Sequence, residues 1–316
     1  MERDGAPEAV REGPRRISGR KTARKIRELV AAAVAARPAG SAPPALAVVR
    51  VGDDPASVVY VNNKEKACRE AGMGSRQHVL DAGAGRREVL QILQQLNEDP
   101  EVDGILVQLP VPPQLEPREL QEAILPAKDV DGLHPLNAGR LAQGAPFLIP
   151  CTPLGILVLL EDHGIAVAGR RVVIVGRSAI VGRPLAQLMS QKGTDATVTV
   201  AHSRTPELGS VTREAEILVA AAGRPGFITG EMVREGAVVV DVGIHRVGES
   251  AAGKPLLAGD VDATSVAPRA AAMTPVPGGV GPMTIALLLA NTLWAAQVRR
   301  EWPAPRPPWR LGEGLV

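Results

Sequence analysis

Short apolar runs alternate with helix-like segments along most of this chain, and that alternation constrains its fold more than any other feature. Runs rich in valine, isoleucine and leucine have the length of buried strands, and longer segments with helical periodicity separate them. Strands that alternate with helices are typical of parallel sheets joined by helical crossovers. The sequence therefore predicts an α/β fold.

The alternation forms two series, separated by a stretch rich in Pro, Gly and Asn over residues 129–153. The chain has 316 residues, about the length of two domains. The first series predicts helices over 18–36, 57–71 and 88–96 and strands over 45–51, around Val79 and over 104–109. The second predicts helices over 152–163, 181–191 and 283–298 and strands over 171–175, 196–201, 216–222 and 237–242. Residues 1–17 and 299–316 are predicted to be flexible tails.

Composition argues against several classes of protein. The 36 Lys and Arg nearly balance 34 Asp and Glu, so charge gives little ground for a nucleic-acid or membrane partner. With only two cysteines, the chain cannot form a disulfide scaffold or a Cys-rich zinc site, and a reducing cytoplasm is the simplest compartment. The cysteines and histidines together offer no convincing metal site. The N-terminus lacks the apolar core of a secretory signal. The apolar run over 283–298 is shorter than the about 20 residues of a membrane span, which predicts a buried helix.

A glycine-rich turn is the first candidate binding element. Residues 171–184 (RVVIVGRSAIVGRP) combine an apolar strand, a turn at Gly176 and a helix start at which Gly182 allows close packing. Free backbone N–H groups at the helix start suit a pyrophosphate. Ser178 replaces the middle glycine of the usual G-x-G-x-x-G fingerprint, so the turn alone is also compatible with a purely structural role.

The end of the next strand indicates which dinucleotide would bind. In NAD-preferring folds an acidic residue there binds the ribose hydroxyls. Here His202 and Ser203 follow the strand instead. Arg177 and Ser203 could hold a 2′-phosphate, which favours NADP, although a solvated surface arginine is the alternative for Arg177.

A second candidate element is the helix that carries the only tyrosine, Tyr60. Ser57 and Lys64 lie three residues before and four after it, so the three side chains share one helix face. An aromatic ring beside an amine suits a planar heterocyclic substrate and proton transfer. A free lysine with a pKa near 10.4 is a poor base at neutral pH, so burial would have to lower that pKa. The alternative is an ordinary amphipathic helix with solvated lysines, such as Lys66 on a different face.

Three further segments bring polar groups or close backbone to candidate ligand positions. Gln108 ends the GILVQLP strand, and ligands bind at the carboxyl ends of strands in open α/β sheets. Asp131 in the DVDG loop could accept hydrogen bonds from a heterocycle, although Asp-Gly is also a common turn. The loop over 274–284 (TPVPGGVGPMT) either approaches a ligand closely or is a plain connection.

Together these segments resemble the bifunctional methylenetetrahydrofolate dehydrogenase/methenyltetrahydrofolate cyclohydrolase (FolD-type) family. The matching segments lie in the family's order over roughly residues 18–298. They are YVNNKEKAC, DGILVQLPVP, KDVDGLHPLNAGRL, PCTPLGI, VVIVGRSAIVGRPLA, DVGI, GDVD and TPVPGGVGPMT.

The resemblance implies a role for each candidate residue. Lys64 would be the catalytic lysine of the cyclohydrolase step, and Gln108 would tune and position it. Tyr60 would stack on the pterin and aminobenzoate, and Asp131 would hold the pterin ring. The other implied substrate-binding residues are Ser57, Leu109, Pro277, Gly278 and Gly279, and the implied cofactor-binding residues are Gly176, Arg177, Ser178, Ser203, Ile244 and Thr284.

The resemblance also implies an architecture and a metabolic setting. Residues 18–150, completed by the helix over 283–298, would form the folate-binding catalytic domain. Residues 151–282 would form a Rossmann-like NADP-binding domain, which faces the first domain across a cleft. The family usually dimerises through this NADP-binding domain. The reactions belong to the one-carbon metabolism that serves purine and amino-acid synthesis, and need no metal.

Three alternatives remain open at this stage: a dehydrogenase with a vestigial cyclohydrolase, a silent folate- or nucleotide-binding regulator, and another two-domain NADP enzyme such as a shikimate or amino-acid dehydrogenase. The chain also departs from the family pattern at three places. His245 stands where asparagine is frequent, Ser18 where aspartate is common, and the Ala-rich residues before Thr274 where Tyr or Phe often occurs. These departures concern the details of the nicotinamide pocket.

Overall fold

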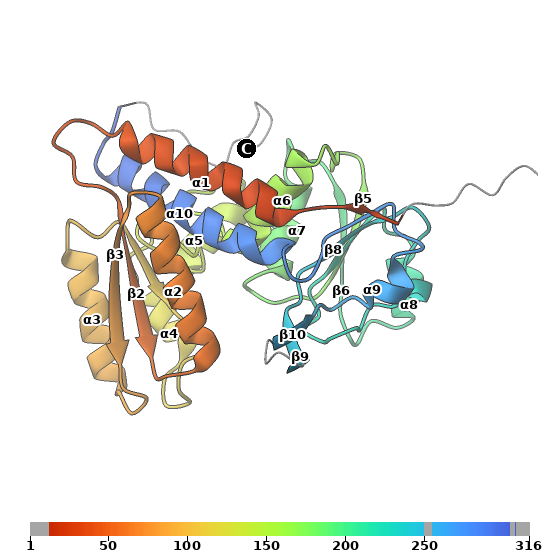
Figure 1. Cartoon of the computed structure of the whole chain (residues 1–316), viewed down its shortest axis with the longest axis horizontal. Coiled ribbons are helices and arrows are strands. Elements are labelled where there is room, and N and C mark those ends of the chain that lie inside the picture. Colours follow the sequence, from red (N-terminus) through yellow and green to blue (C-terminus); the bar gives the residue numbers. More distant parts are fainter. Residues whose placement is uncertain (1–12, 250–254, 304–306, 308–316) are drawn as a thin grey trace, which may run out of the picture.

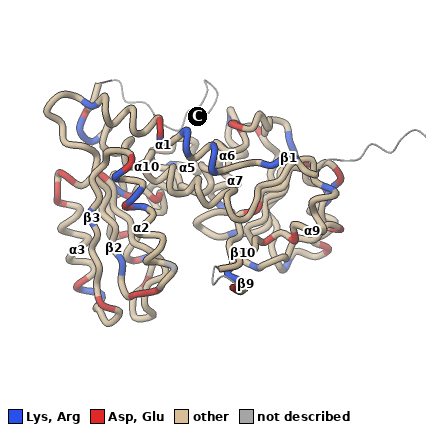
Figure 2. The backbone as a smooth tube through the Cα atoms, viewed as in Figure 1, with Lys and Arg blue, Asp and Glu red and all other residues tan. Residues whose placement is uncertain are grey.

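The computed structural model describes residues 13–249, 255–303 and 307. Figure 1 shows two α/β lobes side by side, with two long helices, α1 (Gly19–Ala35) and α10 (Val280–Arg299), lying across the top of the first lobe and reaching the second. Figure 2 shows Lys and Arg interspersed with Asp and Glu over both lobes. The α/β fold predicted from the alternating apolar runs is confirmed.

The first lobe holds a three-stranded parallel sheet. Its order is β3 (Gly74–Leu80), β2 (Ala45–Val51), β4 (Gly104–Val107), and all pairings are parallel. All four residues of β4 and six of the seven of β2 are buried, which is why these strands are apolar throughout except at Arg50. The connecting helices are α2 (Pro55–Glu70), α3 (Arg86–Glu98) and α4 (Pro117–Glu122).

The second lobe holds a six-stranded parallel sheet. Its order is β1 (Arg15–Arg16), β11 (Ala272–Met273), β8 (Val238–Asp241), β7 (Ile217–Ala220), β5 (Arg171–Val175), β6 (Thr197–Ala201). An antiparallel hairpin of β9 (His245–Glu249) and β10 (Pro255–Ala258) projects from it. The helices are α7 (Gly182–Ser190), α8 (Leu208–Thr212) and α9 (Ala263–Val266), with a 3₁₀ turn over Gly230–Met232.

Helix α10 is the centre of the largest core and packs against α1 and α6 (Cys151–Asp162). By length and composition it could cross a membrane, but 67% of its apolar window is buried inside the protein, as the prediction of a buried helix requires. The side-chain amide of Asn291 also donates to the backbone oxygens of Val130 and Ile149, each at 2.8 Å. These bonds fasten α10 to the loop that carries the DVDG segment.

Several residues placed in flexible tails are in fact ordered. Arg15 and Arg16 pair with β11, and Arg299 and Arg300 both bind the buried Asp103 carboxylate. Seven further positions of the segments predicted as tails are described, and one of them, Trp302, is 7% exposed. The rest of these segments lies outside the described residues.

The Pro- and Gly-rich stretch over 129–153, predicted to separate the two series, contains helix α5 (Pro135–Ala142), which was not predicted. Helix α4 was likewise not predicted. Ser18 occupies the N-cap of α1, but its hydroxyl makes no capping bond, and its backbone N–H donates to His163 Nε2 at 3.0 Å.

Candidate active site

Lys64 is buried at the inner face of α2, with only 8% of the residue exposed. Its Nζ donates a hydrogen bond of 2.8 Å to Gln108 Oε1. Burial lowers the pKa of Lys64, and the nearby Asp131 carboxylate offsets part of that change. The amine is therefore withdrawn from solvent and biased toward its neutral form, so the alternative of a solvated surface lysine is wrong for this residue.

Lys66 provides the contrast that the helix periodicity predicts. Its side chain is 73% exposed and lies 3.9 Å from the Glu70 carboxylate one turn later. Two lysines two residues apart on one helix thus occupy opposite environments.

The local backbone fixes the direction of the Gln108 amide. The residue follows β4, and its backbone N–H donates to Val49 O at 2.8 Å, which extends the sheet pairing. Its side-chain Nε2 donates to Leu109 O at 2.7 Å. Because that bond fixes which end of the amide carries nitrogen, Oε1 is the atom presented to Lys64.

Asp131 lies in a turn that the neighbouring Asp129 organises. The Asp129 carboxylate accepts hydrogen bonds from the backbone N–H groups of Leu133 at 3.2 Å and His134 at 2.8 Å, and from the Asn137 amide at 2.9 Å. Burial raises the pKa of Asp129 to about 7. Sequence reasoning assigned no role to Asp129, although the DVDG motif itself marked the turn.

Asp131 and Lys64 influence each other electrostatically. Burial raises the pKa of Asp131, and the Lys64 amine counteracts that shift. The structure therefore brings Lys64, Gln108 and Asp131 together from α2, the end of β4 and the DVDG turn. A buried amine held by an amide oxygen and placed near a carboxylate is an arrangement suited to proton transfer.

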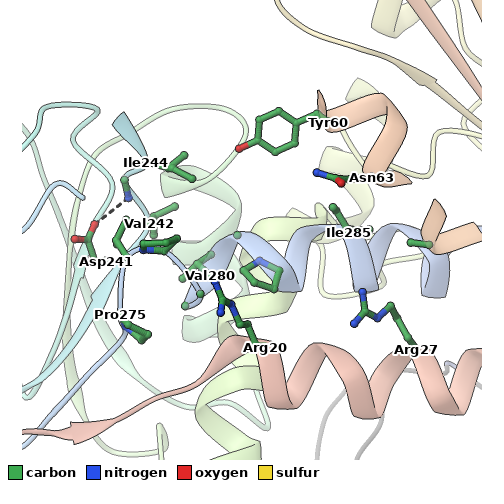
Figure 3. A pocket seen from close by; sticks show the side chains of 18 of the residues that line it. Arg20, Arg27, Tyr60, Asn63, Asp241, Val242, Ile244, Pro275, Val280 and Ile285 are labelled. Atoms are coloured by element: carbon green, nitrogen blue, oxygen red, sulfur yellow. Dashed lines mark hydrogen bonds between the residues drawn. The ribbon is translucent and has the colours of Figure 1, made fainter. Parts of the chain in front are cut away.

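A cavity of about 510 Å³ opens between the two lobes. Lys64, Gln108 and Asp131 are not among the residues that line it, whereas Lys66 is. Figure 3 shows the Tyr60 ring extending toward Ile244, while Arg20 and Arg27 rise from α1 on the other side. Tyr60 is 40% exposed, so its ring is available for stacking. Of the residues predicted as site residues, the lining contains Tyr60, Ile244, Pro277, Gly278 and Gly279.

The other predicted substrate and cofactor residues lie outside that lining. Ser57 is 3% exposed, and its hydroxyl has no hydrogen-bond partner within the described part of the chain. Leu109 contributes its carbonyl to Gln108. Thr284 pairs through its hydroxyl with Thr152 at 2.9 Å.

The glycine turn of the second lobe is as tight as predicted. Gly176 has a φ of +138°, and a Cβ added there would lie 2.0 Å from Ala221 O. A Cβ at Gly182 would lie 2.1 Å from Gly176 O. Only glycine fits at either position. The absence of side chains at Gly176 and Gly182 therefore lets the backbone of this turn form a close-packed cradle.

One expectation about this turn is wrong. The N–H groups at the start of α7 are not free, because those of Val181 and Arg183 donate to the Ser178 hydroxyl and carbonyl, each at 3.1 Å, and the next residue is proline. Within this turn, the backbone N–H groups of 177–180 donate to no acceptor in the described part of the protein. A phosphate would therefore meet that loop rather than the helix start.

Arg177 and Ser203 lie at the same edge of the sheet. β5 and β6 pair in parallel with Val175 opposite Ala201, and both candidate residues follow these strand ends and are exposed. In the described residues no cluster of three or more His, Cys, Asp or Glu side chains is arranged to hold a metal ion.

Comparison with known proteins places this geometry in a family. Residues 17–131 match the model of the tetrahydrofolate dehydrogenase/cyclohydrolase catalytic domain, and residues 150–300 that of the NAD(P)-binding domain of the same family. The bifunctional protein FolD of Synechococcus sp. (strain RCC307) is 54% identical over 293 residues, which are 92% of this chain and 98% of that protein.

Solved structures agree with that placement. The bifunctional FolD of Campylobacter jejuni superposes with a TM-score of 0.84 at 42% identity, covering 90% of this chain and 98% of the other. The Trypanosoma brucei dehydrogenase-cyclohydrolase, complexed with NADP and an inhibitor, superposes with a TM-score of 0.84 at 37% identity, covering 90% and 97%. The chain therefore belongs to the tetrahydrofolate dehydrogenase/cyclohydrolase family.

Proposed function

We propose that this protein is a bifunctional enzyme that oxidises 5,10-methylenetetrahydrofolate to the 5,10-methenyl form with NADP and hydrolyses that product to 10-formyltetrahydrofolate. The observation that carries the proposal is the buried Lys64 amine, hydrogen-bonded to Gln108 and one helical turn from the Tyr60 ring beside the cavity. Relatives at about 50% identity over most of the chain carry the name of the bifunctional protein.

The cyclohydrolase step follows from the chemistry of the amine. The methenyl substrate carries a delocalised positive charge, which a permanently charged lysine would repel. A neutral Lys64 instead takes a proton from the water that adds to the one-carbon unit, and its ammonium form returns a proton to the departing ring nitrogen. The carbon to N5 bond breaks, the remaining hydroxyl proton of the adduct is released to solvent, and the formyl group stays on N10. Asp131 binds the pterin ring, and Tyr60 stacks against the substrate.

The oxidation step requires a dinucleotide, and the second lobe fits one. Gly176 and Gly182 leave a backbone cradle that a Cβ would fill, and the N–H groups of 177–180 point to no protein acceptor. A bound NADP would supply the acceptor for the hydride of the methylene carbon. We propose that Gly176, Arg177, Ser178 and Ser203 hold its phosphate end, and that Ile244 and Thr284 contact the nicotinamide end.

A coupled assay tests the proposal directly. Methylenetetrahydrofolate is supplied with NADP or with NAD, and both the absorbance of the methenyl intermediate and the final formyl product are followed. Both products with NADP are expected. Accumulation of the methenyl form alone would identify a dehydrogenase with a vestigial cyclohydrolase, and tight binding without turnover would identify a silent regulator.

Arg177→Ala is expected to raise the KM for NADP by about tenfold or more while changing the KM for NAD by less than about twofold. The reason is that only NADP carries the 2′-phosphate that the exposed guanidinium would bind. Arg183→Ala removes an exposed arginine from the neighbouring helix and serves as the control. Equal effects on both dinucleotides in steady-state kinetics would remove the basis for assigning NADP.

Asp131→Asn is expected to shift the pH profile of cyclohydrolase kcat to lower pH. The Asp131 carboxylate raises the pKa of Lys64, so its removal lowers that pKa further and the neutral base appears at lower pH. Glu65→Gln, beside Lys64 but on the solvated side and paired with Arg69, is the control and should leave the profile unchanged. An unshifted profile in Asp131→Asn would show that the carboxylate does not act on the amine.

We also propose that residues 18–150 with the helix over 283–298 form the folate-binding domain, and residues 151–282 the NADP-binding domain. The two family models support a boundary within residues 132–149, but the NAD(P)-binding model runs on to residue 300. The packing of α10 against α1 supports assigning the helix over 283–298 to the first domain. The protein is proposed to be a cytoplasmic homodimer that serves purine and amino-acid synthesis, with a small-molecule folate rather than nucleic acid or membrane as its partner. The nearly balanced charge of the chain supports a small-molecule partner over nucleic acid or a membrane.

A further inference from the structure

Two buried aspartates hold together the loops at the carboxyl edge of the second sheet. The Asp260 side chain is completely buried. Its Oδ2 accepts a hydrogen bond from the backbone N–H of Gly223 at 2.9 Å, and its Oδ1 one from that of Arg224 at 3.0 Å. These two residues follow β7, so Asp260 fixes the loop at the end of that strand.

Asp241 fastens the neighbouring strand end, that of β8. Its Oδ1 accepts from the N–H groups of Gly243 and Asp260, each at 2.9 Å, and its Oδ2 accepts from Val261 N–H at 3.1 Å. A Cβ added at Gly243 would lie 2.4 Å from Asp260 Oδ1, and one added at Gly259 would lie 1.8 Å from Asp241 Oδ2. The backbone passes both carboxylates without spare room, so a displacement of one loop is transmitted to the other.

His245 contributes the one side chain that bonds to Asp260 among the described residues. The imidazole Nε2 lies 2.7 Å from Asp260 Oδ1, and the side chain is 24% exposed. An ionised carboxylate only accepts hydrogen bonds, so Nε2 carries the proton. A fully buried carboxylate depends on such donors, because each one offsets the lost hydration of its charge.

The position of His245 in the chain links this bond to the cavity. His245 directly follows Ile244, which lines the cavity and is 47% exposed. It is also the first residue of β9, where it pairs with Ala258 of β10. The imidazole therefore holds the base of the hairpin against the loop after β7, with the cavity-facing Ile244 immediately before it.

We propose that His245 is a positioning residue for the oxidation step. Through Asp260 it holds Ile244 and the loop beginning at Gly223 in the arrangement that receives the nicotinamide end of the dinucleotide. The inference rests on the proposed function, because it concerns the reaction that uses NADP. An asparagine, the residue frequent at this position in the family, also offers an N–H donor. The required property is therefore a hydrogen bond donated to Asp260, and an imidazole ring is not needed for it.

The enzyme's two activities provide the test. His245→Ala removes the donor and is expected to raise the KM for NADP about tenfold or more. Cyclohydrolysis of added methenyltetrahydrofolate uses no dinucleotide and should keep its kcat and KM. His245→Asn should recover most of the affinity for NADP. His78→Ala, which removes a half-buried histidine from β3 in the other lobe, should change neither activity.

Each other outcome counts against the proposal. An unchanged KM for NADP in His245→Ala, or no recovery in His245→Asn, would overturn it. A parallel loss of both activities would show that the histidine acts on folding alone. If the wild-type protein does not oxidise methylenetetrahydrofolate, the proposed function fails. Calorimetric titration with NADP then tests the role of His245 separately: the wild-type protein and His245→Asn should bind NADP more tightly than His245→Ala.

Discussion

Lys64→Met is expected to abolish cyclohydrolase activity and leave the protein folded. Methionine matches the length of the lysine stem and suits a site where burial already disfavours the charged amine. Removing the group that both accepts and returns a proton should lower kcat by about 10²-fold to 10⁴-fold or more. The measurement is the decay of methenyltetrahydrofolate absorbance, corrected for the uncatalysed hydrolysis.

Lys66→Met is the matched control, because it makes the same substitution two residues away at an exposed position. Because Lys66 lines the cavity, its removal can change KM, but the kcat for the methenyl substrate should stay at the wild-type value. If Lys66→Met is inactive and Lys64→Met is active, the assignment of the buried amine is wrong. If both variants are active, the proton is transferred by another group and the mechanism proposed for this site fails.

The central strands β2 and β5 were predictable because nearly all of their residues are buried, unlike those of the edge strand β6. The strands predicted over 45–51 and 171–175 have these bounds in the structure. Their apolar runs end where burial ends, so composition and boundary coincide. The predicted helices over 18–36 and 57–71 likewise agree with α1 and α2 to within two residues at either end.

The errors occur where order depends on a distant partner. Arg15 and Arg16 carry no apolar pattern, and they form a strand only because β11, more than 250 residues later, offers a free edge. Arg299 and Arg300 are ordered by Asp103, which lies in the first lobe. No local sequence signal contains such a pairing, so charged and proline-rich ends were assigned to tails.

In the candidate site, too, local features were predictable and features that depend on distant segments were not. Spacing placed Tyr60 and Lys64 on one helix face, and the structure has them there. Spacing could not establish that Lys64 is buried, because the covering residues Gln108 and Asp131 come from segments 44 and 67 residues further along the chain. The resemblance to a family, and not the helix pattern, singled out this lysine.

The cofactor edge shows a further limit. The glycine turn was predicted from its sequence, but the Ser178 hydroxyl proved to accept a backbone N–H that was expected to be free. Asp241 and Asp260 act on backbone N–H groups, which every residue other than proline possesses. The residues that these two carboxylates bind therefore cannot be recognised in the sequence, which marks only the DVGI and GDVD segments that contain the aspartates.

Gly176→Ala is expected to destabilise the second lobe and abolish oxidation with NADP. The added methyl would lie 2.0 Å from Ala221 O, a backbone atom at the end of β7 that cannot move without disturbing the sheet. The clash and the left-handed φ of +138° together cost about 2–6 kcal/mol. A loss of that size lowers Tm by about 10 °C in a thermal unfolding scan without dinucleotide.

Gly193→Ala separates the two contributions to that cost. Gly193 has a φ of +97°, but a Cβ there would meet nothing within 4 Å, so the substitution introduces backbone strain without a clash. It should lower Tm by a few degrees at most and keep the KM for NADP. Because Gly176 directly follows β5 and Ala221 directly follows β7, the clash acts at the sheet edge where the dinucleotide is proposed to bind. A Gly176→Ala protein with wild-type Tm and NADP kinetics would therefore show that the close approach of these two strand ends is not required for the site.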